Sequence, residues 1–339
     1  MIRRSDILFF FGVILALYAA WLARDVLLLI YISALFAVVL MPAINGVRRL
    51  RIGRWRPGKG MAIAIILLAG LTLLALFLAF VAPPIFHDAQ AFAADWPDHV
   101  PQIVSRVHRL PFTSRINAAS LQKTLDRMSN TMLGELFVFS RNVAGGVFWF
   151  FIWLILTLYF IADGERAFNW FLSLFPAAPR NRLEPTLLRA ETRVQKWLIG
   201  QGVLMLMMGS ASALVFGILG VKYFYALAVF AGLANMVPFI GPVSAAALAS
   251  LLAGIDSWTK LFGVLIFYFV YEQIENGILI PRIMKSTLDL PPLAVIIALS
   301  VGGALAGILG ALVAVPTAAL VAVLLEEYVV TPHKAQRSP

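Results

Sequence analysis

Cysteine is absent from this chain, and charged residues are scarce. The sequence of 339 residues has Cys 0 and only 13% Asp, Glu, Lys and Arg, whereas a soluble chain carries about 25%. The lack of cysteine excludes disulfides and cysteine-based metal sites. The lack of charge, together with 61% hydrophobic residues, indicates a protein that folds in lipid.

Signals of enzymatic chemistry are also missing. The four histidines do not have the spacing of metal ligands, and no Walker A sequence or motif for covalent catalysis is present. We therefore predict no catalytic residues, no metal site, no cofactor and no enzyme. The histidines are His87, His99, His108 and His333.

The net charge of +10 does not indicate nucleic-acid binding, because the basic residues lie mainly in loops beside apolar segments. There they orient a membrane protein and contact anionic lipid head groups. The loop 45–60 contains several basic residues and no acid, from Arg48 to Lys59, which is a strong cytoplasmic marker. The N-terminus, two spans earlier, is then also cytoplasmic.

Long apolar runs dominate the rest of the chain. The run Leu293–Leu325 contains no charged residue, and about 20 apolar residues already cross a bilayer. We expect 7–23 and 26–41 to form a transmembrane hairpin rather than a cleaved signal peptide, and the third span to end at Pro83-Pro84. Predicted spans are 7–23, 26–41, 61–82, 143–162, 198–219 and 258–280.

The predicted fold is an all-α, polytopic transmembrane helical bundle with broken or re-entrant helices. An extracytoplasmic insert of amphipathic helices follows the third span, either as a solvated lid or as a gate, and 167–197 form cytoplasmic interfacial helices. The expected divisions are the first three spans at 1–82, the insert at 83–140, the fourth span and interfacial helices at 141–197, the broken core at 198–325 and a polar tail at 326–339.

The first predicted break separates two short apolar stretches, Ala226–Val237 and Val243–Ala253. Prolines and a glycine between them cannot lie inside a continuous helix, so the segment is a re-entrant hairpin or a sharply kinked span. Freed backbone survives at membrane depth only inside protein or against a watery cavity. A transport path or ion site here would use Asn235, Pro238, Gly241 and Pro242, although a purely structural kink fits the same residues.

A polar cluster near the end of the span 258–280 is the main site candidate, and it consists of Glu272, Gln273, Glu275 and Asn276. Helical spacing places 272, 275 and 276 on one face. A carboxylate at mid-membrane costs roughly 2.5 to 3.5 kcal/mol, so such groups usually pair, bind an ion or relay a proton. The alternative is an interfacial cap near Pro281, with both glutamates solvated or paired to Arg282.

Glycines punctuate the charge-free run near the C-terminus. The run is too long for one untilted crossing, so it is a second re-entrant hairpin or a half-helix followed by a full helix. The pair Gly303 and Gly307 has GxxxG spacing. We interpret Gly302, Gly303, Gly307 and Gly310 as helix-packing residues rather than ion ligands.

Several motifs in the C-terminal half resemble the autoinducer-2 exporter family of bacterial membrane proteins. The resemblance is strongest over 190–325 and covers the whole chain weakly. The motifs are Leu198-Ile199-Gly200-Gln201, Val237-Pro238-Phe239-Ile240-Gly241-Pro242, Gln273-Ile274-Glu275-Asn276, Pro281-Arg282-Ile283-Met284, Gly302-Gly303, Gly307-Ile308-Leu309-Gly310-Ala311 and Val315-Pro316.

The resemblance implies a multispan transporter of the bacterial inner membrane and a homo-oligomer, with a pentamer as one expected form. Members of the family are associated with export of autoinducer-2 in quorum sensing, and others with sodium/proton antiport. Family members often have Gly at the position of Lys285 and His at that of Pro291. If that histidine couples protons elsewhere, Glu272 and Glu275 are the remaining titratable candidates in this chain.

The function predicted from sequence is therefore export of a small, autoinducer-2-like solute or exchange of a cation for protons. The expected partners are membrane lipid, the solute or cation and other copies of the chain, with no nucleic acid. The alternative is a non-transporting oligomeric membrane scaffold or channel-like protein whose broken helices only pack.

Overall fold

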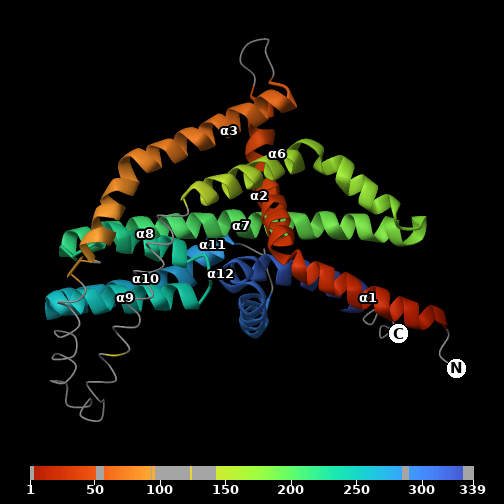
Figure 1. The fold of residues 1–339 in the computed structure, drawn as a ribbon. Helices are drawn as coiled ribbons and strands as arrows, with labels where there is room; N and C mark the ends of the chain where they lie inside the picture. The colour runs from red at the N-terminus through yellow and green to blue at the C-terminus, as the bar shows by residue number, and fades with distance from the viewer. Residues whose placement is uncertain are drawn as a thin grey trace, which may run out of the picture. The chain divides into compact units, whose positions relative to one another are not determined.

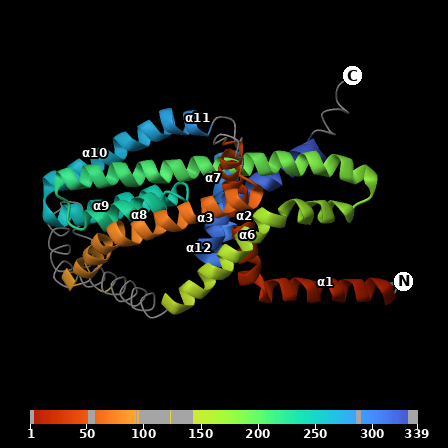
Figure 2. The same ribbon diagram turned by 90° about the horizontal axis from the view of Figure 1, so that it is seen from above.

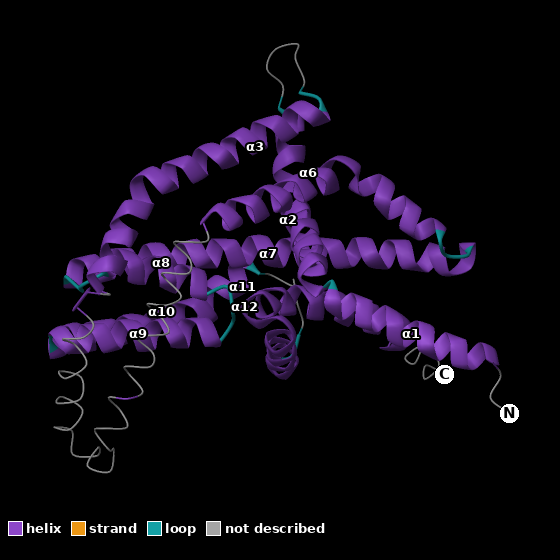
Figure 3. Cartoon of the chain, viewed as in Figure 1, coloured by secondary structure: helices purple, strands orange, loops and turns teal. Residues whose placement is uncertain are grey.

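The computed structural model describes residues 4–50, 57–92, 94–95, 123, 143–284 and 290–330. These residues form helices joined by short turns, and no strand occurs among them (Figure 3). The all-α prediction is confirmed. Most of the insert expected at 83–140, including its amphipathic stretches, lies outside the described residues, as do Lys285 and the end of the tail.

Within the described part of the chain, 6 helices are long and apolar enough to cross a membrane, judged by length and composition. A polytopic helical protein was expected from the apolar runs, and this result agrees with it. The helices are Arg24–Arg49, Lys59–Phe92, Gly145–Ser173, Ala177–Leu219, Trp258–Ile283 and Pro292–Val330.

Two compact units make up the fold, and each is assembled from segments that are distant in sequence. Unit 1 contains Met1–Ile66, Phe150–Ile199 and Ser286–Pro339, and unit 2 contains Leu67–Trp149 and Gly200–Lys285. Three long helices pass from one unit into the other. They are α3 (Lys59–Leu76), α6 (Val143–Ser173) and α7 (Ala177–Leu219) (Figure 1).

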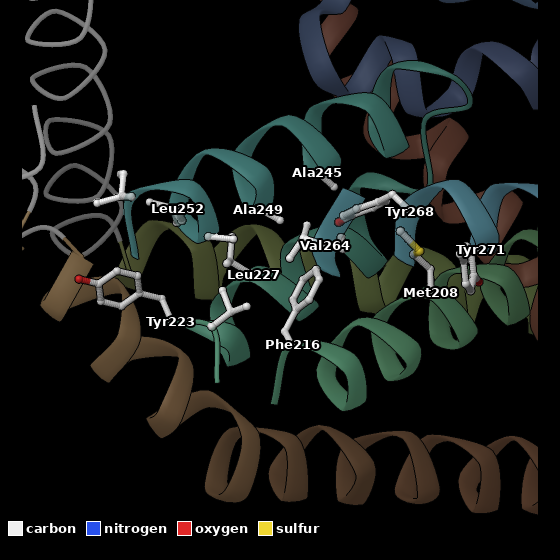
Figure 4. Packing of buried hydrophobic residues seen from close by; sticks show 14 residues of the cluster. Met208, Phe216, Tyr223, Leu227, Ala245, Ala249, Leu252, Val264, Tyr268 and Tyr271 are labelled. Atoms are coloured by element: carbon white, nitrogen blue, oxygen red, sulfur yellow. The ribbon is translucent and has the colours of Figure 1, made fainter. Parts of the chain in front are cut away.

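Unit 2 is built around the C-terminal half of α7 and three further helices. These are α8 (Phe224–Ala234), α9 (Ile240–Asp256) and α10 (Trp258–Ile274), with α9 packed against both others. Phe216 of α7, Leu227 of α8 and Val264 of α10 are buried in one apolar cluster (Figure 4). Small residues at Ala245 and Ala249 line the buried face of α9 and allow close helix packing.

The sequence explains where α7 ends and where α10 begins. Gly220 has a positive φ of 63°, and the amides of Gly220 and Val221 bond the carbonyls of Gly217 and Phe216, which is the Schellman pattern. Ser257 caps α10 by accepting a hydrogen bond from the Lys260 amide at 3.2 Å.

Unit 1 begins with α1 (Arg4–Leu22) and α2 (Arg24–Arg49), separated by Ala23 alone. The connection of an antiparallel helical hairpin needs at least two residues, so the predicted transmembrane hairpin is wrong and the chain bends at Ala23. Further along α2, Ile44 packs with Ala62 and Ile161 in a small core. The hydroxyls of Tyr31 and Thr317 share a hydrogen bond of 3.1 Å.

The last helix, α12 (Pro292–Leu325), is two helices joined at a sharp break. Ala306 and Gly307 have non-helical backbone angles, and Gly307 combines φ 58° with ψ −139°, a conformation open essentially to glycine alone. A Cβ at Gly310 would overlap the carbonyl oxygen of Gly302, and a Cβ at Gly302 would meet that of Gly310. The two halves therefore fold back against each other with backbone in contact.

The GxxxG pair predicted from sequence, Gly303 and Gly307, makes no close contact in this chain. Gly303 lies before the break and Gly307 lies at it, and a Cβ added to either would meet nothing within 4 Å. The close contact belongs to Gly302 and Gly310 instead. Spacing alone cannot identify this pair, because GxxxG presumes an uninterrupted helix.

Beyond α12, a short π-helix named η3 (Glu326–Val330) is held to α7 by ion pairs within unit 1. Glu327 accepts hydrogen bonds from Arg182 at 3.0 Å and from Arg189 at 2.7 Å. Arg193 pairs with Glu326 at 3.1 Å. Three arginines of α7 are thus paired with the two glutamates of η3.

Three helices extend past the ends that composition predicts. The third span continues through Pro83-Pro84 to Phe92, and α6 continues through Asp163-Gly164-Glu165-Arg166 to Ser173. Of the segment 167–197 that was expected to form separate interfacial helices, 167–173 complete α6 and 177–197 begin α7, with Pro185 inside α7. Charged residues mark where the apolar surface ends, but most are good helix formers.

Two π-helices lie inside longer helices, and each precedes a proline by two residues. They are η1 (Phe77–Val81) before Pro83 and η2 (Glu275–Leu279) before Pro281. A proline ring lacks an N–H and crowds the carbonyl four residues earlier, and in both cases that carbonyl belongs to the π segment. The wider turn gives this carbonyl room. After η2, the helix continues as α11 (Ile280–Ile283) (Figure 2).

Candidate functional site

The turn between α8 and α9 occupies 235–239 and contains Pro238, whereas Gly241 and Pro242 lie at the start of α9. The amides of Met236 and Val237 bond carbonyls in the last turn of α8. Phe239 has φ 64° and ψ −53°, and the Ile240 amide bonds the Pro238 carbonyl across it at 2.8 Å. This is the γ-turn of positive φ, which is rare and strained. Strain of this kind, about 1–3 kcal/mol, concentrates at functional sites.

Glycine is required at the start of α9. A Cβ at Gly241 would overlap the carbonyl oxygen of Ala234 at the end of α8, so only glycine lets the two helices approach here. Pro242 lies in the first turn of α9, where a missing N–H is tolerated. These residues build the turn; the polar contacts come from their neighbour Asn235.

Asn235 is the polar centre of this end of unit 2. It is 3% exposed, and its side-chain amide donates a hydrogen bond to the Glu275 carboxylate at 3.2 Å. Its backbone carbonyl accepts a hydrogen bond of 2.6 Å from the side chain of Gln201, which is 6% exposed. Gln201 of α7, Asn235 at the C-terminal end of α8 and Glu275 of η2 therefore meet at the break.

The second glutamate lies in a different environment. Glu272 and Asn276 are exposed, and Asn276 donates to Glu272 at 3.4 Å. Gln273 is exposed as well. The structure thus brings Glu275 to Asn235 and leaves the rest of the predicted cluster outside this contact. Glu275 begins the π-helix η2, and π-turns inside α-helices are frequent at functional sites.

Buried hydroxyl groups extend from this point into unit 2. Tyr271 is one turn before Glu275 and Tyr268 is one turn earlier, so the three share a face of α10. Figure 4 shows both tyrosines in the buried cluster, with Met208 nearby. The hydroxyls of Ser250 and Tyr271 are buried and have no hydrogen-bond partner among the described residues, whereas the hydroxyls of Tyr268 and Ser212 lie near each other.

Acidic residues also lie at the N-terminal end of α8. Asp88 accepts hydrogen bonds from the amides of Tyr225 at 3.0 Å and Ala226 at 3.3 Å, and it thereby caps the helix from a distant segment. The Tyr223 hydroxyl donates to Asp95 at 2.6 Å. Burial, with the carboxylates of Asp95 and Asp88, raises the pKa of Tyr223 above its usual range, so the hydroxyl remains a donor.

Reasoning from sequence missed Gln201 and the two tyrosines as members of this site. Gln201 appeared only within a family motif, yet a carboxamide inside a long apolar stretch is itself a signal of buried polar contacts. The spacing of Tyr268, Tyr271 and Glu275 could have indicated a polar face on α10. The Asp88 cap carries no such signal, because it depends on contacts between distant segments.

Comparison with known proteins places the chain among membrane transport proteins. The family described as AI-2E family transporter matches residues 9–330. YueF of Bacillus subtilis is 26% identical over 311 residues, covering 86% of this chain and 84% of its own. YrrI of the same organism is 26% identical over 233 residues, 68% of this chain but 62% of its own, less than two thirds of that relative.

A Mycobacterium tuberculosis protein is 32% identical over 175 residues, 49% of this chain and 46% of its own. All three relatives carry the name "Putative transport protein". The family match covers nearly all of the spans described above. This chain is therefore a multi-pass membrane protein, and it belongs to the AI-2E transporter family.

Proposed function

We propose that this chain is an inner-membrane transporter that exports a small solute, such as an autoinducer-2-like molecule, or exchanges a cation for protons. Its path passes the break between α8 and α9, where Asn235 and Glu275 meet. This single contact carries the proposal, because it joins a carboxylate to a buried carboxamide at the point where the helical backbone is interrupted.

The chemistry of the contact suits a transported ion or polar solute. An ionised Glu275 attracts a cation, and a protonated one is neutral and donates a hydrogen bond, so the same group can exchange the two. The carboxamide of Asn235 supplies a neutral oxygen ligand and a donor. Interrupted helices that present such groups at membrane depth are a recurrent device of transporters.

Helix lengths favour a re-entrant arrangement of α8. It has 11 residues, about 16 Å at 1.5 Å per residue, which is roughly half the hydrocarbon core of about 30 Å. The turn at 235–239 then lies within the membrane rather than beyond it. Polar backbone at that depth requires protein or water around it, and Gln201 already supplies one partner.

The buried hydroxyls of Tyr268 and Tyr271 extend the same path along α10. The Tyr271 hydroxyl lacks a partner among the described residues, and an unpaired buried hydroxyl costs about 1–3 kcal/mol. A passing polar solute or water gives this group the partner it lacks. We place the loop 45–60 in the cytoplasm because of its positive charge, and we propose a homo-oligomer surrounded by lipid.

The test uses the purified full chain in liposomes, with sodium flux and internal pH followed together and uptake of candidate solutes measured in parallel. We expect Glu275→Gln to lower coupled flux at least tenfold while the protein still folds. Glu272→Gln is the matched control, because it removes a carboxylate from an exposed position one turn away and should leave flux nearly unchanged.

Two results would count against this proposal. Equal flux in Glu275→Gln and the unmodified chain would remove the proposed path. No flux for any tested solute or ion would favour the non-transporting scaffold instead.

A further inference from the structure

A cavity in unit 1 is unrelated to the polar site of unit 2. It has a volume of about 250 Å³ and lies between α2, α6 and α7. Its walls are mostly apolar, and they include Val38 and Met41 of α2, Phe160 and Phe168 of α6, and Leu188 of α7. This volume is below the usual range for pockets of drug-sized ligands, about 300–1,000 Å³, so any ligand must be small.

Two carboxylates line the same cavity, Glu165 from α6 and Glu191 from α7. Neither has a hydrogen bond or ion pair with another residue in the part of the chain that the structure describes. They come from two different helices, so the cavity itself brings them together.

Both glutamates are exposed, and the arginines nearest to them in sequence pair with other acids. Arg189 and Arg193 lie within one turn of Glu191 on α7, but they pair with Glu327 and Glu326. Arg166 follows Glu165 directly, but it pairs with Asp163 at 3.5 Å. Two carboxylates that are open to solvent and to a ligand therefore stand beside the apolar walls of the cavity.

We infer that this cavity binds a small primary amine that carries an apolar group. The ammonium would lie between Glu165 and Glu191, where charge-assisted hydrogen bonds form, and the apolar group would fill the space lined by Val38, Phe160 and Phe168. An anion would be repelled by the two carboxylates, and a neutral apolar molecule would form no ion pair with them. The ammonium could belong to a soluble amine or to the head group of phosphatidylethanolamine.

The experiment measures binding of phenethylamine to the full chain in phosphatidylcholine nanodiscs by titration calorimetry. We expect saturable binding, at least tenfold weaker binding of the neutral analogue 2-phenylethanol, and about tenfold loss of phenethylamine affinity in Glu165→Gln and in Glu191→Gln. Glu184→Gln is the matched control, since it removes a carboxylate of α7 that does not line the cavity. Unchanged thermal unfolding verifies that each variant folds.

A second variant tests the shape of the site, because Ala34 lines the cavity and Ala34→Leu narrows it. This change should block the amine without altering charge. Nanodiscs containing phosphatidylethanolamine separate the two sources: competition with phenethylamine identifies the lipid head group, and unaltered binding identifies a soluble amine. Absence of saturable binding, equal binding of amine and alcohol, or full affinity in both glutamate variants would overturn the inference.

Discussion

Gly302 and Gly310 touch backbone to backbone across the break of α12, so closely that neither position has room for a side chain. Gly307, between them, supplies the positive φ that the reversal needs. The charge-free run, whose length is too great for one untilted crossing, is therefore a pair of helices held together by two glycines.

Gly310→Ala should lower the free energy of unfolding by about 1–3 kcal/mol, because the added methyl overlaps the Gly302 carbonyl oxygen and forces the two halves apart. Thermal unfolding of the purified protein in detergent measures the change. Gly303→Ala is the control, since a Cβ there meets nothing within 4 Å. Equal losses in the two variants would show that the contact of Gly302 with Gly310 is not what joins the halves.

Gln201→Leu should destabilise the protein by about 1–3 kcal/mol, because it leaves the buried carbonyl of Asn235 without its donor. The matched change Gln273→Leu alters an exposed glutamine and should have little effect. Denaturant titration compares the two. A Gln201→Leu protein as stable as the unmodified chain would mean that another donor reaches this carbonyl.

Tyr271→Phe and Ser250→Ala should not lower stability, since each removes a hydroxyl that has no partner among the described residues. The same changes should reduce transport in liposomes if these hydroxyls line the path. Unfolding and flux are measured on the same preparations, with the exposed Tyr225→Phe as control. A stability loss above about 1 kcal/mol would reveal a hydrogen bond that each hydroxyl makes in the folded protein.

Asp88→Ala should cost about 1 kcal/mol, the usual value of a lost helix N-cap, because two amides at the start of α8 lose their acceptor. Asp88→Asn keeps an acceptor oxygen and should cost less. Gln90→Ala, at an exposed position of the same helix, is the neutral control. If Asp88→Ala unfolds at the same temperature as Gln90→Ala, the cap does not stabilise the helix.

Sequence reasoning located the polar and broken regions better than it located helix ends. Two prolines and Gly241 placed the interruption within three residues of the observed turn, because these residues have few backbone options. The charged residues at 163–166 do not end α6. Composition indicates where the lipid-facing surface stops, but it does not indicate where the chain turns.

The partners of the polar residues were harder to predict. Helical spacing put Glu272 and Glu275 together, but the π-turn starting at Glu275 directs it to Asn235 and leaves Glu272 exposed. The Gln201 contact spans 34 residues of sequence, and pairings between distant segments depend on tertiary packing that a single sequence does not reveal. The position of Pro281 was the one local signal of the π-turn.

The π-helix η2 also has a kinematic consequence. An α-helix turns about 100° and rises 1.5 Å per residue, and a π-turn holds one residue more than an α-turn. Rewinding η2 into an α-helix would therefore twist Pro281–Met284 by about 100° and advance them by about 1.5 Å relative to α10. The π-helical and α-helical forms of the segment that carries Glu275 therefore differ by a single residue of helical register.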